Sequence, residues 1–184
     1  MAQSKARATY EDLMKLPDHV VGEILDGELI VSPRPAARHA LAASVLGHHL
    51  VGPFQLGSGG PGGWWILDEP ELHLGQDVLV PDLAGWRRER MPKVPDVVAF
   101  ELAPDWTCEI LSPSTTRIDR GIKTDLYRRY GVPYYWIVDA DARTVEAYGL
   151  ADDRYALLAR VSGAGPVSLP PFPDLAFAPA SLWP

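Results

Sequence analysis

Hydrophobic and polar positions along the chain alternate between helix-like and strand-like periods, an order typical of a mixed α/β domain. The pattern predicts helices at residues 10–16, 39–51 and 117–130. It predicts a hairpin at 22–31 that turns at Asp26-Gly27, and strands at 64–74, 77–86, 106–111, 134–139, 144–149 and 155–161. The strand–helix–strand unit at 106–139 should join parallel strands by a right-handed crossover.

The length of 184 residues fits one domain with extended ends. Residues 1–8 form a polar stretch, and we expect a flexible N-terminal arm there. The domain itself is predicted at 9–162. Residues 163–184 are rich in proline, so we expect an irregular tail that packs on the domain.

Composition and charge limit the class of protein and the ways in which it could bind nucleic acid. A hydrophobic fraction of 47% and a charged fraction of 22% are typical of a soluble globular chain. The formal net charge of −7 means that any binding of nucleic acid must depend on a local basic patch. No apolar stretch reaches the roughly 20 residues that a membrane span needs, and no secretory signal is visible. The single cysteine, Cys108, favours a reducing, cytoplasmic setting.

Two acidic residues interrupt apolar segments that are predicted as strands. Asp82 lies in VLVPDLAGW and Glu109 in WTCEILSP. A charged carboxylate in such a segment is costly unless it is paired or binds a cation. If the two strands are neighbours, the carboxylates could share a hard, oxygen-ligated ion such as Mg²⁺. The alternative is that each carboxylate faces solvent on a half-exposed strand.

Lys123 adds a cation on the helix that follows the Glu109 strand. Asp119 and Tyr127 lie four residues to either side of it, on the same predicted face. Lys123 could act on a scissile phosphate or on an attacking water. The alternative is an Asp119–Lys123 surface pair, worth about 0.3–0.5 kcal/mol.

These motifs together resemble a known family. PDLAGW, CEILSPST, the spaced Asp119, Lys123 and Tyr127, and GVPYYWIVD are similar to the Uma-type restriction endonucleases. That family, formerly a domain of unknown function, belongs to the PD-(D/E)xK nuclease superfamily. The resemblance extends over TYEDLMKLP, GEILDGELIVSP and His39, and so spans roughly residues 9 to 149. It implies a restriction-endonuclease-like core, a central mixed β-sheet flanked by helices.

The resemblance also implies roles for individual residues. Asp82 and Glu109 match the two acidic ligands of a catalytic Mg²⁺ or Mn²⁺. Leu111 stands where the superfamily usually has its lysine; related families have this lysine on the following helix, where Lys123 is the candidate. Glu23 resembles a further acidic position, and His39 matches a histidine near the start of the next helix.

The function expected from this resemblance is metal-dependent hydrolysis of DNA phosphodiester bonds. A catalytically silent binding or dimerisation module, and a hydrolase of another phosphate substrate, stay open as alternatives. DNA could contact two basic groups, Arg87, Arg88, Arg90 and Lys93 after the Asp82 strand, and Arg117, Arg120, Arg128 and Arg129 on the Lys123 helix; a solvated surface is the alternative. The aromatic segments Trp64-Trp65 and Tyr134-Tyr135-Trp136 suggest a homodimer.

Overall fold

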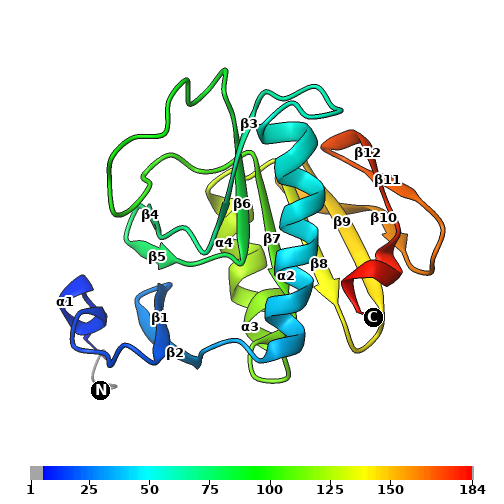
Figure 1. Cartoon of the computed structure of the whole chain (residues 1–184). Coiled ribbons are helices and arrows are strands. Elements are labelled where there is room, and N and C mark those ends of the chain that lie inside the picture. The colour runs from blue at the N-terminus through cyan, green and yellow to red at the C-terminus, as the bar shows by residue number, and fades with distance from the viewer. Residues whose placement is uncertain (1–5, 184) are drawn as a thin grey trace.

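The computed structural model describes residues 6–183 and has the predicted mixed α/β order (Figure 1). The helical segments are α1 (Tyr10–Leu13), α2 (Ala37–Leu50), the π-helical turn η1 (Val51–Gln55), α3 (Thr116–Ile118), the π-helical turn η2 (Asp119–Lys123), α4 (Thr124–Arg129) and the 3-10 turn η3 (Pro179–Leu182). The strands are β1 (Val20–Leu25), β2 (Glu28–Pro33), β3 (Trp64–Asp68), β4 (Leu72–Leu74), β5 (Asp77–Leu79), β6 (Leu83–Arg87), β7 (Trp106–Ile110), β8 (Tyr134–Asp139), β9 (Thr144–Ala151), β10 (Arg154–Val161), β11 (Val167–Leu169) and β12 (Phe172–Phe177).

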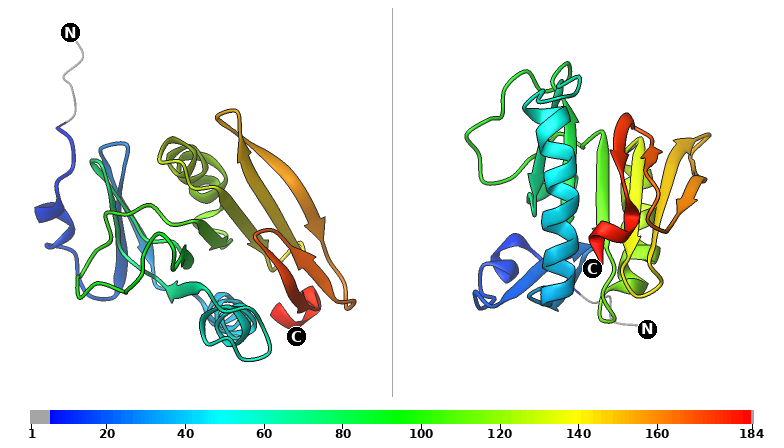
Figure 2. Two further views of the ribbon diagram at one scale, coloured as in Figure 1. Left: turned by 90° about the horizontal axis from the view of Figure 1, so that it is seen from above. Right: turned by 45° about the vertical axis from the view of Figure 1, so that its right-hand side comes forward.

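A six-stranded mixed sheet forms the centre of the molecule, in the order β10-β9-β8-β7-β6-β3. The pair β7–β8 is parallel and the other neighbours are antiparallel, which confirms the predicted strand–helix–strand unit. Helix α2 covers one face of this sheet and the segment α3–η2–α4 covers the other (Figure 2). Residues of one strand therefore alternate between two hydrophobic clusters.

Strand β7 shows this alternation directly. Trp106, Cys108 and Ile110 pack in the cluster under α2, and Cys108 is a core residue as predicted. Thr107 and Glu109 alternate with them, so Glu109 faces α4 although the whole strand is buried. The sheet thus presents one carboxylate to the helix that carries Lys123.

A smaller sheet, β2-β1-β5-β4, lies beside the first. Its β1–β2 hairpin turns at Asp26 and Gly27, which have φ angles of 53° and 84°. Two consecutive positive φ values are those of a type I′ turn, and the predicted hairpin is confirmed. Of the predicted N-terminal arm, residues 1–5 lie outside the described residues, while the amide of Ala8 donates to the carbonyl of Gly27 at 2.9 Å.

The strands predicted at 64–74 and 77–86 are each divided in two. Strand pairing is interrupted at Pro70, between β3 and β4, and at Pro81, between β5 and β6, because proline has no N–H to donate to a neighbouring strand. Strand β5 belongs to the small sheet and β6 to the central one. The sequence predicted Asp82 in the middle of a strand, and this is wrong. Asp82 lies at the junction of the two sheets.

The predicted helices also differ in their limits. Helix α1 ends at Leu13, three residues early, and α2 begins at Ala37. The helix predicted at 117–130 is interrupted by η2, a π-helical turn of a kind often found at functional sites. Among the described residues, no helix combines the length and apolar character needed to cross a membrane.

The prolines of the C-terminal segment suggested an irregular tail, but the segment contains regular strands. Strands β11 and β12 form a hairpin that buries Leu169, Phe172 and Phe177 in the cluster under α2. The ring of Phe172 lies 4.8 Å from that of Trp64 and 5.2 Å from that of Trp106. Short strands broken by proline leave too few positions for a period of two to be visible.

The aromatic segments that suggested a homodimer pack inside this single chain. Trp64 is 5% exposed, and Tyr135 and Trp136 are completely buried. Their apolar area is thus used by the monomer core and gives no argument for a second copy.

Candidate active site

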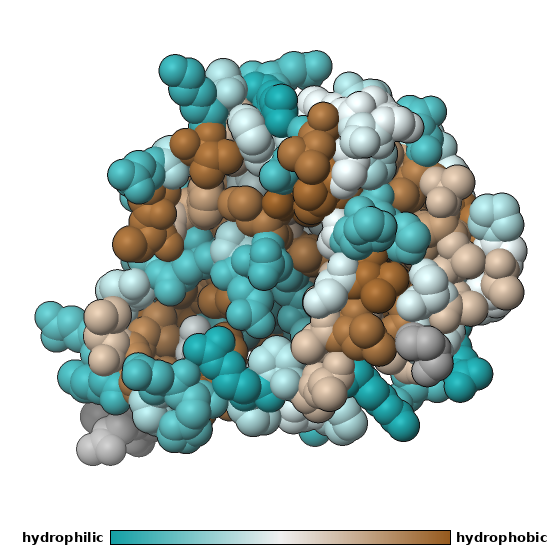
Figure 3. Space-filling model, in the orientation of Figure 1, coloured by the Kyte–Doolittle hydropathy of each residue, from teal (hydrophilic) through white to brown (hydrophobic). Residues whose placement is uncertain are grey.

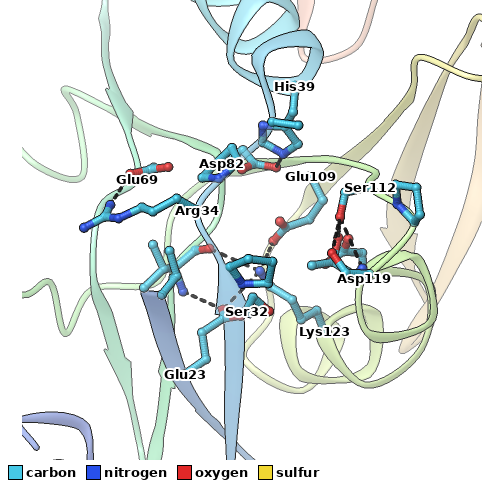
Figure 4. Close-up of a pocket in the computed structure, with 18 residues that line it drawn as sticks. Glu23, Ser32, Arg34, His39, Glu69, Asp82, Glu109, Ser112, Asp119 and Lys123 are labelled. Atoms are coloured by element: carbon cyan, nitrogen blue, oxygen red, sulfur yellow. Dashed lines mark hydrogen bonds and ion pairs between the residues drawn. The ribbon is translucent and has the colours of Figure 1, made fainter. Parts of the chain in front are cut away.

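A cavity opens where the two sheets meet the start of α2 and the start of α3 (Figure 4). Its volume of about 260 Å³ is just below the roughly 300–1,000 Å³ of typical small-molecule sites. The cavity can therefore admit a group the size of a phosphodiester but not a whole duplex. The lining residues with ionisable side chains are Glu23, Arg34, His39, Glu69, Asp82, Glu109, Asp119 and Lys123.

Asp82, one residue before β6, and Glu109 of β7 both line this cavity. Leu83 of β6 pairs with Cys108 of the antiparallel β7, and Asp82 and Glu109 are the next residue along each segment. Residues directly opposite one another in an antiparallel pair point to the same face of the sheet. The structure therefore places both acids at one cavity.

Asp82 is held by two donors through one of its oxygens. Its Oδ2 accepts the backbone N–H of Ile110 at 2.6 Å and lies 3.1 Å from Nε2 of His39. Both side chains are largely buried, with 15% of Asp82 and 11% of His39 exposed. Burial lowers the pKa of His39, but the hydrogen bond to Asp82 and the charges of Asp82 and Asp119 together outweigh it, and the pKa is raised from its usual value. His39 thus orients the aspartate.

Glu109 is held in the same way by two side chains of the helical segment. Its Oε1 lies 2.7 Å from Nζ of Lys123 and accepts the hydroxyl of Tyr127 at 2.6 Å. All three side chains are buried. Each of the two acids is consequently fixed through one oxygen, Oδ2 in Asp82 and Oε1 in Glu109.

Lys123 is not the surface residue that one alternative expected. Its side chain is 3% exposed, and Nζ lies 2.7 Å from Glu109, 3.0 Å from Glu23 and 3.2 Å from the carbonyl of Val80. Burial opposes its charge, but the carboxylates of Glu109, Glu23 and Asp119 together outweigh this effect and raise its pKa. Lys123 is a buried cation between two strands and not a surface partner of Asp119.

Two further acids lie at this cluster. Glu23 reaches it from β1, and Asp119 reaches it from η2, although the sequence analysis did not include Asp119 among the site residues. Glu23 Oε1 accepts the backbone N–H of Val80 at 2.8 Å as well as contacting Lys123. Asp119 is 3% exposed, and burial raises its pKa to about 6 although Lys123 opposes the shift. Its spacing of four from Lys123 was the signal that could have identified it.

The cavity contains more carboxylates than cations. Burial, partly opposed by Lys123, raises the pKa of Glu109 well above its usual value, and Asp119, Asp82 and Glu23 raise it further. At the mouth, Arg34 and Glu69 lie 3.8 Å apart and compensate one another. An additional cation would therefore be stabilised inside the cavity.

The donor chemistry fits a hard divalent cation. The polar contacts of Asp82 and Glu109 use one oxygen each, so the second oxygen of each carboxylate is available to a ligand. Within residues 6–183, no three His, Cys, Asp or Glu side chains converge as a complete metal cage. Two carboxylates with bound water are the usual protein ligands of Mg²⁺, so the residues present fit that ion.

The arginines expected to contact DNA do not line this cavity. Arg87 and Arg88 lie at the far end of β6, where their guanidinium groups stand 4.6 Å from the ring of Trp64 and 4.0 Å from that of Trp65. Arg120 pairs with Glu146 at 2.7 Å, and Arg117 is exposed. Arg87 and Arg88 pack on tryptophan rings because β6 runs away from Asp82, and Arg120 forms an ion pair because it faces β9.

Comparisons with known proteins agree with this architecture. A family model described as "Uma2: Putative restriction endonuclease" matches residues 8–180. The crystal structure of a putative nuclease belonging to DUF820 from Anabaena variabilis has a TM-score of 0.76 and 23% identity, covering 96% of this chain and 97% of that chain. No curated protein matches. At that identity, the structural likeness shows a shared fold.

Proposed function

The chain belongs to the Uma2 family of putative restriction endonucleases, and from this premise we propose that it is a metal-dependent endonuclease that hydrolyses DNA phosphodiester bonds. The observation that carries the proposal is the meeting of Asp82, Glu109 and Lys123 in one cavity. They come from three separate segments, and burying them there is costly without a function or a ligand.

In this proposal Asp82 and Glu109 would hold Mg²⁺ or Mn²⁺. The ion, when bound, stabilises charge on the phosphoryl oxygens and lowers the pKa of a bound water. The chain itself fixes both ligands in advance, since His39 and the Ile110 amide orient Asp82 while Lys123 and Tyr127 orient Glu109. Lys123 also compensates the charge of Glu109 and Glu23 inside the cavity.

Tyr127 offers a test of this orientation. Tyr127→Phe removes one hydroxyl and leaves Glu109 with Lys123 as its only side-chain partner among the described residues, so we expect cleavage to fall by about 10–100-fold. Tyr155→Phe is a matched control, because its hydroxyl donates to the carbonyl of Val132, outside the cavity. Equal activity of the two variants would exclude an orienting role for Tyr127.

One observation favours a catalytically silent module as a second candidate. The three contacts of Lys123 Nζ, to Glu109, Glu23 and the Val80 carbonyl, match the three donors of an ammonium group. A lysine fully occupied in this way could serve only to hold β1, β7 and η2 together. Such a module would bind partners through the same fold without hydrolysing anything.

Metal-dependent cleavage distinguishes these candidates. Plasmid and single-stranded DNA should be cut by the purified chain in Mg²⁺ or Mn²⁺, and EDTA should abolish the activity because both proposed ligands act through the ion. A silent module would leave both substrates intact under every metal. Hydrolysis of a small phosphodiester without cleavage of DNA would instead indicate another phosphate substrate.

A further inference from the structure

A second cavity lies on the other side of the first turn of α2. It is lined by Arg38 and Leu41 of α2, by the turn 140–143 between β8 and β9, and by Leu182 and Trp183 near the C-terminus. None of these residues belongs to the candidate active site. Figure 1 shows the beginning of α2, the β8–β9 turn and the C-terminus together at the lower end of the molecule.

The two cavities are neighbours at the same end of the central sheet. Ala36 and His39 line the first cavity, while Arg38 and Leu41 line the second. The two cavities therefore lie on different sides of the first turn of α2. The loop after β7 borders the first cavity and the loop after β8 the second. Since β7 and β8 are parallel neighbours, both loops leave the same edge of the sheet, where α/β folds commonly bind ligands.

The charged residues that line this second cavity are two arginines and one aspartate. Arg38 is 88% exposed and lies 3.8 Å from Asp141, which is 74% exposed, so solvent weakens this ion pair. Arg143 is exposed, and the described residues place no carboxylate within ion-pair distance of it. The first turn of α2 adds to this field, because its N-cap, Ala36, makes no side-chain capping bond and the turn has no acidic residue.

The same cavity has an apolar side. Leu41 is 43% exposed, and Trp183 is partly exposed while it packs against the core cluster under α2. In Figure 3, apolar patches border hydrophilic groups on the face formed by α2 and the C-terminal segment. Arginines and an aromatic ring that line one cavity suit a single nucleic-acid strand, because cations bind its phosphates and a ring can stack on a base.

We propose that the DNA strand cleaved in the first cavity continues over the first turn of α2 into the second one. Arg38 and Arg143 bind its phosphates there, and Trp183 packs against a nucleotide. A helix is about 10–12 Å wide with its side chains, and duplex DNA rises 3.4 Å per nucleotide on each strand. The contact therefore lies about three nucleotides from the scissile bond. This inference rests on the proposed nuclease function, and it supplies the local cations that a chain of net charge −7 requires.

Binding of fluorescein-labelled single-stranded and duplex DNA to the full chain tests the proposal. Anisotropy is measured in EDTA over a range of salt, so that cleavage does not contribute. Arg143→Glu should lower the slope of log affinity against log salt by about 0.7 for single strands and about 0.9 for duplex, one phosphate contact. Trp183→Leu keeps an apolar side chain and should weaken single-strand binding by about 5–100-fold.

Arg154→Glu is the matched control. Arg154 is also exposed and stands beside a hairpin turn, but at the opposite end of β9, and the net charge changes by the same amount. The proposal is overturned if Arg143→Glu and Arg154→Glu bind DNA alike, or if the unaltered chain does not bind DNA.

The outcome for this surface is separable from that for the catalytic site. Metal-dependent cleavage with unchanged binding of Arg143→Glu and Trp183→Leu would retain the nuclease and reject the surface. Binding that depends on Arg143 and Trp183, without cleavage in any metal, would retain the surface and reject the catalytic assignment.

Discussion

Asp82→Asn should reduce cleavage of plasmid DNA by about 10³-fold, with little change in the melting temperature. The substitution removes the negative charge of a proposed metal ligand, and one preorganised electrostatic group is commonly worth 10²–10³ in rate. The amide oxygen of asparagine can still accept the Ile110 N–H that now bonds to Asp82 at 2.6 Å, so the junction of the two sheets should persist. Initial rates in Mg²⁺, with thermal unfolding of the same samples, measure both effects.

Asp68→Asn is the control for this change. Asp68 is the last residue of β3 and pairs with Leu83, the residue that follows Asp82 in the sequence. Asp68 does not line the cavity. It should cleave like the unaltered chain. Normal cleavage by Asp82→Asn would exclude the aspartate as a required ligand, whereas loss of activity in both variants would point to a general effect of charge.

Lys123→Met should destabilise the fold by about 3–5 kcal/mol, and cleavage should fall by about 10²–10³-fold in the protein that remains folded. Methionine fills a similar volume but leaves Glu109 and Glu23 buried without their cation. Removing one partner of a buried ion pair is costly because the remaining charge is uncompensated. Urea unfolding at pH 7 in EDTA measures the loss. Arg129→Met, which removes an exposed partner of Asp26, should change stability by less than about 1 kcal/mol.

The destabilisation of Lys123→Met should depend on pH. Burial already raises the pKa of Glu109 above its usual 4.5, and loss of the opposing Lys123 raises it further. An acid with a raised pKa in the folded state is penalised above that pKa, and the penalty disappears as the pH falls toward its unfolded value. The difference in stability from the unaltered chain should therefore shrink between pH 7 and about pH 4.5. A difference independent of pH would mean that lost packing, not unpaired charge, destabilises the variant.

Much of this protein was predictable from local pattern. The Asp26-Gly27 hairpin and the parallel β7–β8 unit depend on short-range periodicity and turn chemistry, which one segment contains by itself. Membership of the Uma2 family was recognisable because its motifs survive as short strings around Asp82, Glu109 and Lys123. The predictions were wrong in segments where proline shortens the strands, at Pro81 and in the C-terminal hairpin.

The sequence by itself thus determined which residue types occur at which spacing, and from these the mixed α/β class and the acids to examine. Only the tertiary structure decided that Asp82 stands at a junction of two sheets, that Lys123 is buried between Glu109 and Glu23, and that Arg87 and Arg88 pack on tryptophans. Burial and ion pairing depend on contacts between segments far apart in the chain. The same lysine spacing suits a solvent-exposed pair or a buried cation, and its surroundings alone determine which forms.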